Sequence, residues 1–200
     1  MDGMNKRPAL ARLADLVFEA GMLRKTPRTG YQFLGSGSEN VAEHSFRTAL
    51  IGYILAVMSE ANPERTAMLC LIHDFHEART GDFNYVNSIY NSTNHRLAME
   101  HALSGTCVAE PLMSLWDEQD KEESKESLLA KDADQIDLIF NLIEERDKGN
   151  AYADKWLENA VKRIESEAGK TLVEKALQTD HTDWWFKGPD ENWWVHRGRK

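Results

Sequence analysis

The residue types best suited to chemistry are concentrated in residues 73–82, which hold two histidines, two aspartates and a glutamate: His73, Asp74, His76, Glu77 and Asp82. Apolar residues at helical spacing run up to and through this stretch, which predicts that it packs against the core. Burying so many ionisable groups is costly unless each charge is compensated. A bound divalent cation would compensate imidazoles and carboxylates together, so the stretch predicts a metal site.

A metal ion needs ligands from more than one element, and two other segments offer them. His73 and Glu77, four residues apart, are expected to share a helix face. His44 lies among apolar residues on the preceding helix, where the plainer interpretation is a hydrogen-bonded core histidine. Three acids that fall where an amphipathic helix should be apolar, or that could form a solvated stripe, are Asp132, Asp134 and Asp137. The conjunction of all three segments favours metal binding over these alternatives.

The scaffold that positions these residues is predicted to be all-α, because apolar residues recur at intervals of three and four and no strand alternation occurs. Residues 83–93 are polar and rich in asparagine, which predicts a loop. We expect a single-domain bundle of about six to seven helices over residues 1–180. The segments with helical periodicity are residues 8–25, 41–57, 63–80, 94–107, 108–118, 122–147 and 150–178.

Residues 181–200 form a tail rich in tryptophan: Trp184, Trp185, Trp193 and Trp194. So many large aromatic side chains are costly to leave in water, so we expect the tail to pack on the domain or on a dimer mate. An aromatic lid over a ligand is the alternative. Cys70 and Cys107 are too few for a disulfide framework and are expected to be reduced, buried thiols.

Charge and hydropathy limit the classes of partner. The net charge of −9 argues against binding to a nucleic-acid polymer, while the short basic run at residues 24–28 suits a small anionic ligand. No apolar run approaches the length of a membrane span, and residues 1–11 lack the apolar core of a signal peptide. The sequence therefore predicts a cytoplasmic protein without a membrane partner.

The order His44, His73–Asp74, Asp134 resembles the HD-domain metal-dependent phosphohydrolases. More narrowly, it is similar to the branch that contains bacterial 5′-deoxynucleotidases and their eukaryotic HD-domain-containing relatives. Residues 39–45 (ENVAEHS), 73–82 (HDFHEARTGD) and 131–134 (KDAD) carry the resemblance. The implied fold is an HD-type helical bundle, and the implied assembly is a homodimer.

The resemblance also implies roles for individual residues. The metal ligands would be His44, His73, Asp74 and Asp134. Asp134 is preferred to Asp132 because the family's acid follows a Lys-x-x pattern, here begun by Lys131. Glu77 would act on the attacking water, Asp82 would line the substrate sugar, and Arg28 would contact the phosphate. Imidazole and carboxylate ligands suit one divalent ion, with Mn, Co or Fe favoured and Mg or Zn compatible.

The implied activity is hydrolysis of (deoxy)nucleoside 5′-monophosphates to nucleoside and phosphate. Two departures from the family pattern leave the substrate open: Thr29 and Gly30 precede the aromatic Tyr31, and Phe83-Asn84-Tyr85 replaces a proline-rich turn. One alternative is an HD phosphohydrolase that acts on another phosphorylated metabolite or nucleotide. The other is a non-catalytic regulator that binds metal or nucleotide.

Overall fold

The computed structural model describes residues 8–187 of the chain. Within this range the chain is helical and has no strand, only an isolated antiparallel bridge between Pro27 and Asn40. The all-α prediction is therefore confirmed, although the helices, labelled α1 to α12, are more numerous than expected. None of these helices combines the length and apolar character that a membrane span requires.

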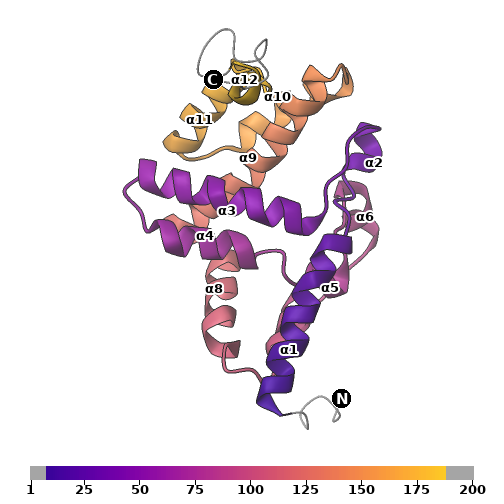
Figure 1. The fold of residues 1–200 in the computed structure, drawn as a ribbon, viewed down its shortest axis with the longest axis vertical. Coiled ribbons are helices and arrows are strands. Elements are labelled where there is room, and N and C mark those ends of the chain that lie inside the picture. The colour runs from indigo at the N-terminus through magenta and orange to yellow at the C-terminus, as the bar shows by residue number, and fades with distance from the viewer. Residues whose placement is uncertain (1–7, 188–200) are drawn as a thin grey trace, which may run out of the picture.

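Three helices form the centre of the molecule: α3 (Val41–Met58), α4 (Pro63–Ile72) and α9 (Lys125–Asp147). Each of the three packs against the other two. Figure 1 shows α3 and α4 lying side by side across the middle of the molecule, with α9 behind them. The side chains buried where they meet include Leu55, Leu69, Ile136, Ile139 and Leu142. This apolar core fixes the three helices that carry the chemistry-bearing residues.

The remaining helices cover the two ends of this core. At one end lie α10 (Tyr152–Ala160), η3 (Val161–Arg163), α11 (Glu167–Leu177) and α12 (Asp183–Phe186). At the other end, a second apolar cluster joins α1 (Ala9–Ala20), η2 (Gly21–Lys25), α7 (His95–Leu103) and α8 (Ala109–Lys121). Three short helices complete the described chain: α2 (Tyr31–Leu34), α5 (Glu77–Thr80) and α6 (Tyr85–Tyr90).

Side-chain caps set the start of the two helices that lead into the predicted site. The Asn40 side chain accepts a hydrogen bond from the Glu43 N–H, and the Glu43 carboxylate accepts one from the Asn40 N–H, which makes a capping box for α3. At the start of α4, the Asn62 side chain accepts a hydrogen bond from the Arg65 N–H, with Pro63 in the first turn. These caps place His44 near the start of α3 and His73 at the end of α4.

The prediction of one continuous helix over residues 63–80 is wrong, because the helix is interrupted in the middle. Helix α4 ends at Ile72, residues 73–76 form turns, and α5 begins at Glu77. The Trp116 indole N–H donates to the carbonyl of His73, and the His73 ring bonds the carbonyl of Cys70. These side chains take up carbonyl groups that a continuous helix would use. His73 and Glu77 therefore do not share a helix face.

Two further segments differ from expectation for similar reasons. Within the predicted loop 83–93, Asn84 accepts hydrogen bonds from the backbone N–H groups of residues 86 and 87 and so starts α6. The single helix predicted over residues 150–178 is instead α10, η3 and α11. It is interrupted at residues 164–166, where the Asp132 carboxylate accepts from the N–H groups of Glu165 and Ser166.

Of the two thiols, Cys70 is buried as expected but Cys107 is exposed.

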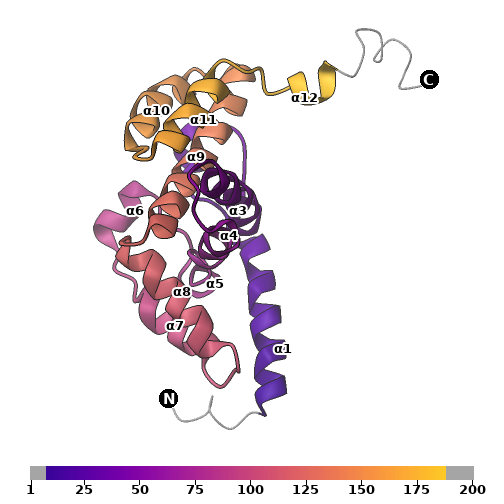
Figure 2. The same ribbon diagram turned by 90° about the vertical axis from the view of Figure 1, so that its left-hand side faces the viewer.

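Part of the tryptophan-rich tail can be placed. Trp184 and Trp185 lie in α12, which Figure 2 shows projecting beyond α11, and the Trp184 side chain is 85% exposed. Trp193 and Trp194 lie outside the described residues. A domain boundary near residue 180 and the packing of the tail on the domain or a dimer mate stay predictions.

The role of Asp132 generates a stability prediction. Its carboxylate is buried and anchors the turn before α11, so Asp132→Ala leaves two backbone N–H groups without their acceptor. We expect the free energy of unfolding in urea to fall by about 2–3 kcal/mol. Glu158→Ala, an exposed acid on α10, is the matched control and should change it by less than about 0.5 kcal/mol. Equal stability of the two variants would contradict this account.

Candidate metal centre

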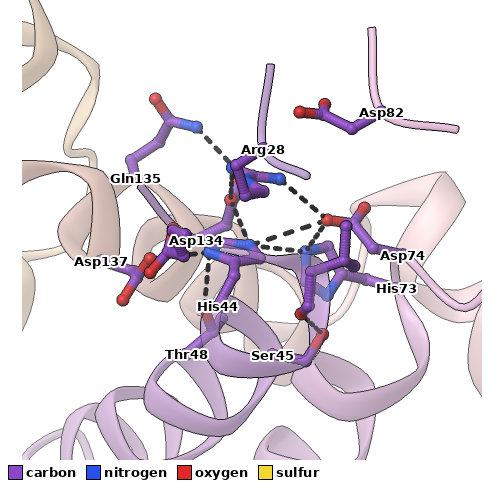
Figure 3. Close-up of polar contacts among 12 residues, drawn as sticks. Arg28, His44, Ser45, Thr48, His73, Asp74, Asp82, Asp134, Gln135 and Asp137 are labelled. Carbon is purple, nitrogen blue, oxygen red and sulfur yellow. Dashed lines mark hydrogen bonds and ion pairs between the residues drawn. The ribbon is translucent and has the colours of Figure 1, made fainter. Parts of the chain in front are cut away.

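The residues predicted from three separate segments converge in the structure (Figure 3). His44 comes from α3, His73 and Asp74 from the turns that follow α4, and Asp134 from α9. The Nε2 atom of His44 lies 3.1 Å from Oδ1 of Asp134 and 3.4 Å from Nε2 of His73. The Nε2 atom of His73 lies 3.1 Å from Oδ2 of Asp74. Both imidazoles therefore point the same ring nitrogen at the two carboxylates.

The donor set fits a divalent metal ion. Nitrogen and oxygen ligands lie about 2.0–2.2 Å from such an ion, which puts neighbouring donor atoms about 3 Å apart. One donor atom each from His44, His73 and Asp134 all lie within 4.8 Å of one another, and Asp74 adjoins them. Two imidazoles with two carboxylates suit a divalent transition ion.

The electrostatics of the cluster favour added positive charge. Burial and Arg28 lower the pKa of His44, but the hydrogen bonds of Asp134 and Asp137 and the charge of Asp134 outweigh them and raise it to about 10. Burial alone would raise the pKa of Asp134, yet the hydrogen bond and charge of His44 lower it to about 2. The carboxylates therefore favour added positive charge, which protons on the imidazoles or a bound divalent ion can supply.

Hydrogen bonds behind the two histidines fix their orientation. Oδ2 of Asp137 lies 2.7 Å from Nδ1 of the fully buried His44, and Oδ1 of Asp137 accepts from the Arg47 guanidinium at 2.5 Å. The His73 Nδ1 atom donates to the Cys70 carbonyl at 2.6 Å. In both rings the Nδ1 contact leaves Nε2 to face the cluster, the arrangement typical of metal-binding histidines.

The structure separates the three acids of α9. Asp134 lies against His44, Asp137 lies behind the same ring, and Asp132 points to the turn before α11. Spacing alone left all three open as ligands. The supporting role of Asp137 was missed, although its position three residues after Asp134 on one helix face was a usable signal.

Glu77 and Arg28 lie beside the cluster. Glu77 is 8% exposed, and no described residue donates a hydrogen bond to its buried Oε2 atom. Burial, with the charges of Asp74 and Asp82, raises the pKa of Glu77 to about 9. The Arg28 guanidinium lies 3.2 Å from Asp74 and 3.8 Å from Asp134. A buried carboxyl group and a cation therefore flank the same carboxylates.

Asp82 holds the segment that carries Arg28. Its Oδ2 atom accepts from the backbone N–H of Thr29 at 2.5 Å and from the Thr29 hydroxyl at 3.4 Å. The same carboxylate lines the pocket described below. Its predicted contact with a sugar stays a prediction, and the structure adds a second role, the positioning of Arg28.

Comparison with known proteins now identifies the family. A family model described as "HD domain" matches residues 20–176. The chain belongs to the HD domain family. It is 29% identical over 126 residues to "5′-deoxynucleotidase HDDC2" of Danio rerio, a match covering 60% of this chain and 62% of that protein, which is less than two thirds of that relative's length. It is 29% identical over 150 residues to a 5′-deoxynucleotidase of Vibrio cholerae, covering 65% of this chain and 76% of that protein.

A solved structure agrees with this HD assignment at the level of fold. It is the crystal structure named "Predicted metal-dependent phosphohydrolase" from Magnetospirillum magnetotacticum. The two chains superpose with a TM-score of 0.65 at 22% identity, covering 85% of this chain and 91% of the other. The expected HD-type helical bundle is therefore confirmed.

A pocket of about 290 Å³ lies beside the cluster of His44, His73, Asp74 and Asp134. Its lining includes the charged residues Arg28, Asp74, Asp82 and Asp134. Aromatic and amide side chains also line it: Tyr31, Phe83, Tyr85, Trp156, Asn84, Gln135 and Asn141. Trp156 has the spacing of a core residue in the predicted helix over residues 150–178, and periodicity does not identify Gln135 or Asn141 as pocket residues. The pocket thus joins charged groups to a flat, partly apolar surface.

The hydrogen bond between Asp137 and His44 generates a prediction about metal affinity. Asp137→Asn keeps the shape but weakens the acceptor that orients the imidazole, so we expect Mn²⁺ affinity to fall about 10–100-fold. Equilibrium dialysis of Mn²⁺ against the metal-stripped protein measures this. Glu144→Gln is the control, because Glu144 also pairs with Arg47 but does not contact His44. Equal affinity in both variants would show that Asp137 does not position His44.

Proposed function

We propose that this HD-domain protein is a metal-dependent phosphomonoesterase that hydrolyses nucleoside 5′-monophosphates, the 2′-deoxy forms in particular, to nucleoside and phosphate. The observation that carries the proposal is the convergence of His44, His73, Asp74 and Asp134 beside a pocket that Asp74 and Asp134 line together with aromatic side chains. The names of the Danio rerio and Vibrio cholerae relatives support the same activity.

In this proposal the four clustered side chains hold one divalent ion. Mn, Co or Fe is favoured, and Mg or Zn is compatible with the same donors. When bound, such an ion polarises a phosphate oxygen and acidifies water. His44 and His73 contribute Nε2 donors whose direction is set by Asp137 and by the Cys70 carbonyl. Asp74 and Asp134 contribute oxygens and neutralise the ion's charge.

Glu77 is proposed to handle the proton of the attacking water. Its carboxyl group is buried, and its Oε2 atom has no hydrogen-bond donor among the described residues. Its pKa is raised to about 9, chiefly by burial. An ion bound in the neighbouring cluster would add positive charge and lower that pKa toward neutrality, where a carboxyl group can accept and release a proton efficiently.

Arg28 is proposed to bind the phosphate of the substrate, and Asp82 is proposed to bind its sugar. The Arg28 guanidinium is already turned toward Asp74 and Asp134, so a phosphate bound there would meet a two-pronged donor. Oδ2 of Asp82 is engaged with Thr29, and its other oxygen is the one proposed to accept from a sugar hydroxyl. Both groups line the pocket.

The size and lining of the pocket favour a small ligand over a polymer. Its volume, about 290 Å³, lies near the lower end of ligand pockets, about 300 Å³. Tyr31 and Trp156 offer flat surfaces for a base, and the net charge of −9 disfavours a nucleic-acid chain. The alternative substrate, another phosphorylated metabolite, would contact the charged side chains of the pocket and not its aromatic ones.

A second copy of the chain is the partner proposed for an apolar stripe on α3. Phe46, Leu50 and Val57 share one face of this helix and are 72%, 54% and 56% exposed. Such a continuous apolar surface is typical of a protein contact, and a homodimer fits the family resemblance. Cytoplasmic residence is part of the same proposal.

Phosphate release from a panel of substrates tests the activity. We expect release from deoxy- and ribonucleoside 5′-monophosphates, fastest with the deoxy forms, when Mn²⁺, Co²⁺, Mg²⁺ or Zn²⁺ is supplied to the metal-stripped protein. Sugar phosphates and nucleoside 3′-monophosphates complete the panel. Release only from sugar phosphates would favour the other-metabolite alternative. No release from any compound with any ion would favour the non-catalytic regulator.

Substitution of Glu77 tests its role separately from metal binding. Glu77→Ala should retain bound metal, because Glu77 is not among the proposed ligands, while kcat falls about 10²–10⁴-fold through loss of proton transfer. Metal content by elemental analysis and initial rates of phosphate release measure the two effects. Glu100→Ala, an exposed acid on α7, is the control. Turnover that survives in Glu77→Ala would exclude Glu77 as the group that handles water.

A further inference from the structure

The two carboxylate oxygens of Asp134 make different contacts. Oδ1 faces the cluster, 3.1 Å from Nε2 of His44. Oδ2 accepts a hydrogen bond from the side-chain amide of Gln135 at 2.8 Å. Figure 3 shows Gln135 beside Asp134, on the side away from His73. A carboxylate held through one oxygen in this way presents the other to an ion in a fixed direction.

The orientation of the Gln135 amide is fixed by its two neighbours. The Arg163 guanidinium lies 3.1 Å from Oε1 of Gln135. Because a guanidinium can only donate and a carboxylate can only accept, the amide oxygen must face Arg163 and the amide nitrogen must face Asp134. The chemistry of the partners therefore allows one of the two amide orientations and forbids the other.

Arg163 is in turn fixed by Tyr85. The central carbon of its guanidinium lies 4.9 Å from the centre of the Tyr85 ring, and one of its nitrogens donates to the Tyr85 hydroxyl. Tyr85 is the first residue of α6, and both Tyr85 and Gln135 line the pocket. A continuous set of contacts thus runs from the pocket wall to Asp134 through η3 and α9.

We propose that Gln135 and Arg163 are positioning residues that direct Oδ1 of Asp134 toward the ion and tie that direction to the pocket wall at Tyr85. The inference rests on the metal site of the proposed function. It extends that site to a residue of η3 that no donor pattern in the sequence singles out. A ligand that displaces Tyr85 would then change the affinity for the ion. The bound ion would change the affinity for that ligand by the same factor.

A double-mutant cycle on metal affinity tests the inference. Gln135→Met and Arg163→Met remove the hydrogen bonds while keeping long side chains, and each should weaken Mn²⁺ binding about tenfold in equilibrium dialysis. Because both residues act through one chain of contacts, the double variant should bind Mn²⁺ no more weakly than Gln135→Met alone. Arg163→Lys, which keeps one donor, should recover part of the loss. Lys162→Met, an exposed neighbour, is the control and should bind as the wild type does.

A second measurement separates positioning from loss of structure. Circular dichroism of each variant should match the wild type, and raising the Mn²⁺ concentration should restore the phosphate-release rate of Arg163→Met to the wild-type value. Unchanged Mn²⁺ affinity in either single variant, fully additive losses in the double variant, or a rate that Mn²⁺ does not restore would each overturn the inference. The dialysis needs no turnover, so a protein that releases no phosphate but shows the non-additive cycle would refute the proposed reaction and retain the positioning role.

Discussion

The structure depends on an imbalance of charge at the junction of α3, α4 and α9. Asp74, Asp134 and Glu77 bring three carboxyl groups to a place where Arg28 is the adjoining formal cation. Like charges held this close in a partly buried site are unfavourable unless positive charge balances them. The imidazoles of His44 and His73 respond with raised pKa values, and a divalent ion would satisfy the same demand without a proton. The rest of the fold holds these charged groups in position.

Two sets of contacts hold the cluster in place, the apolar core and the hydrogen bonds that orient the clustered side chains. The apolar core fixes the three helices, so the four clustered side chains cannot move apart without opening buried contacts. Asp137 and the Cys70 carbonyl then fix the imidazoles, while Asp82 fixes the segment that carries Arg28. Each of these contacts holds a polar group that would otherwise be buried without a partner. Stability and site geometry are therefore properties of the same interactions.

The sequence predicted the parts of this account that follow from pattern. Helical periodicity located the long helices, and the unusual donors His44, His73 and Asp134 indicated which helices must meet. The sequence did not predict features set by single long-range hydrogen bonds. The break after Ile72 depends on Trp116, and the break at residues 164–166 depends on Asp132, each more than thirty residues away in the chain. Trp156 lines a pocket although its spacing is that of a core residue, because periodicity reports burial and not what a side chain is buried against.

The central claim is that the cluster of His44, His73, Asp74 and Asp134 is where this HD domain holds its ion. X-ray diffraction from crystals of the Mn²⁺-loaded protein, collected at the manganese absorption edge, tests it most directly. The account predicts one anomalous peak within bonding distance of the Nε2 atoms of His44 and His73 and of the two carboxylates. A peak at the surface group Asp147, Asp180 and His181 instead would contradict it. So would the absence of any peak when the same protein preparation binds manganese in solution.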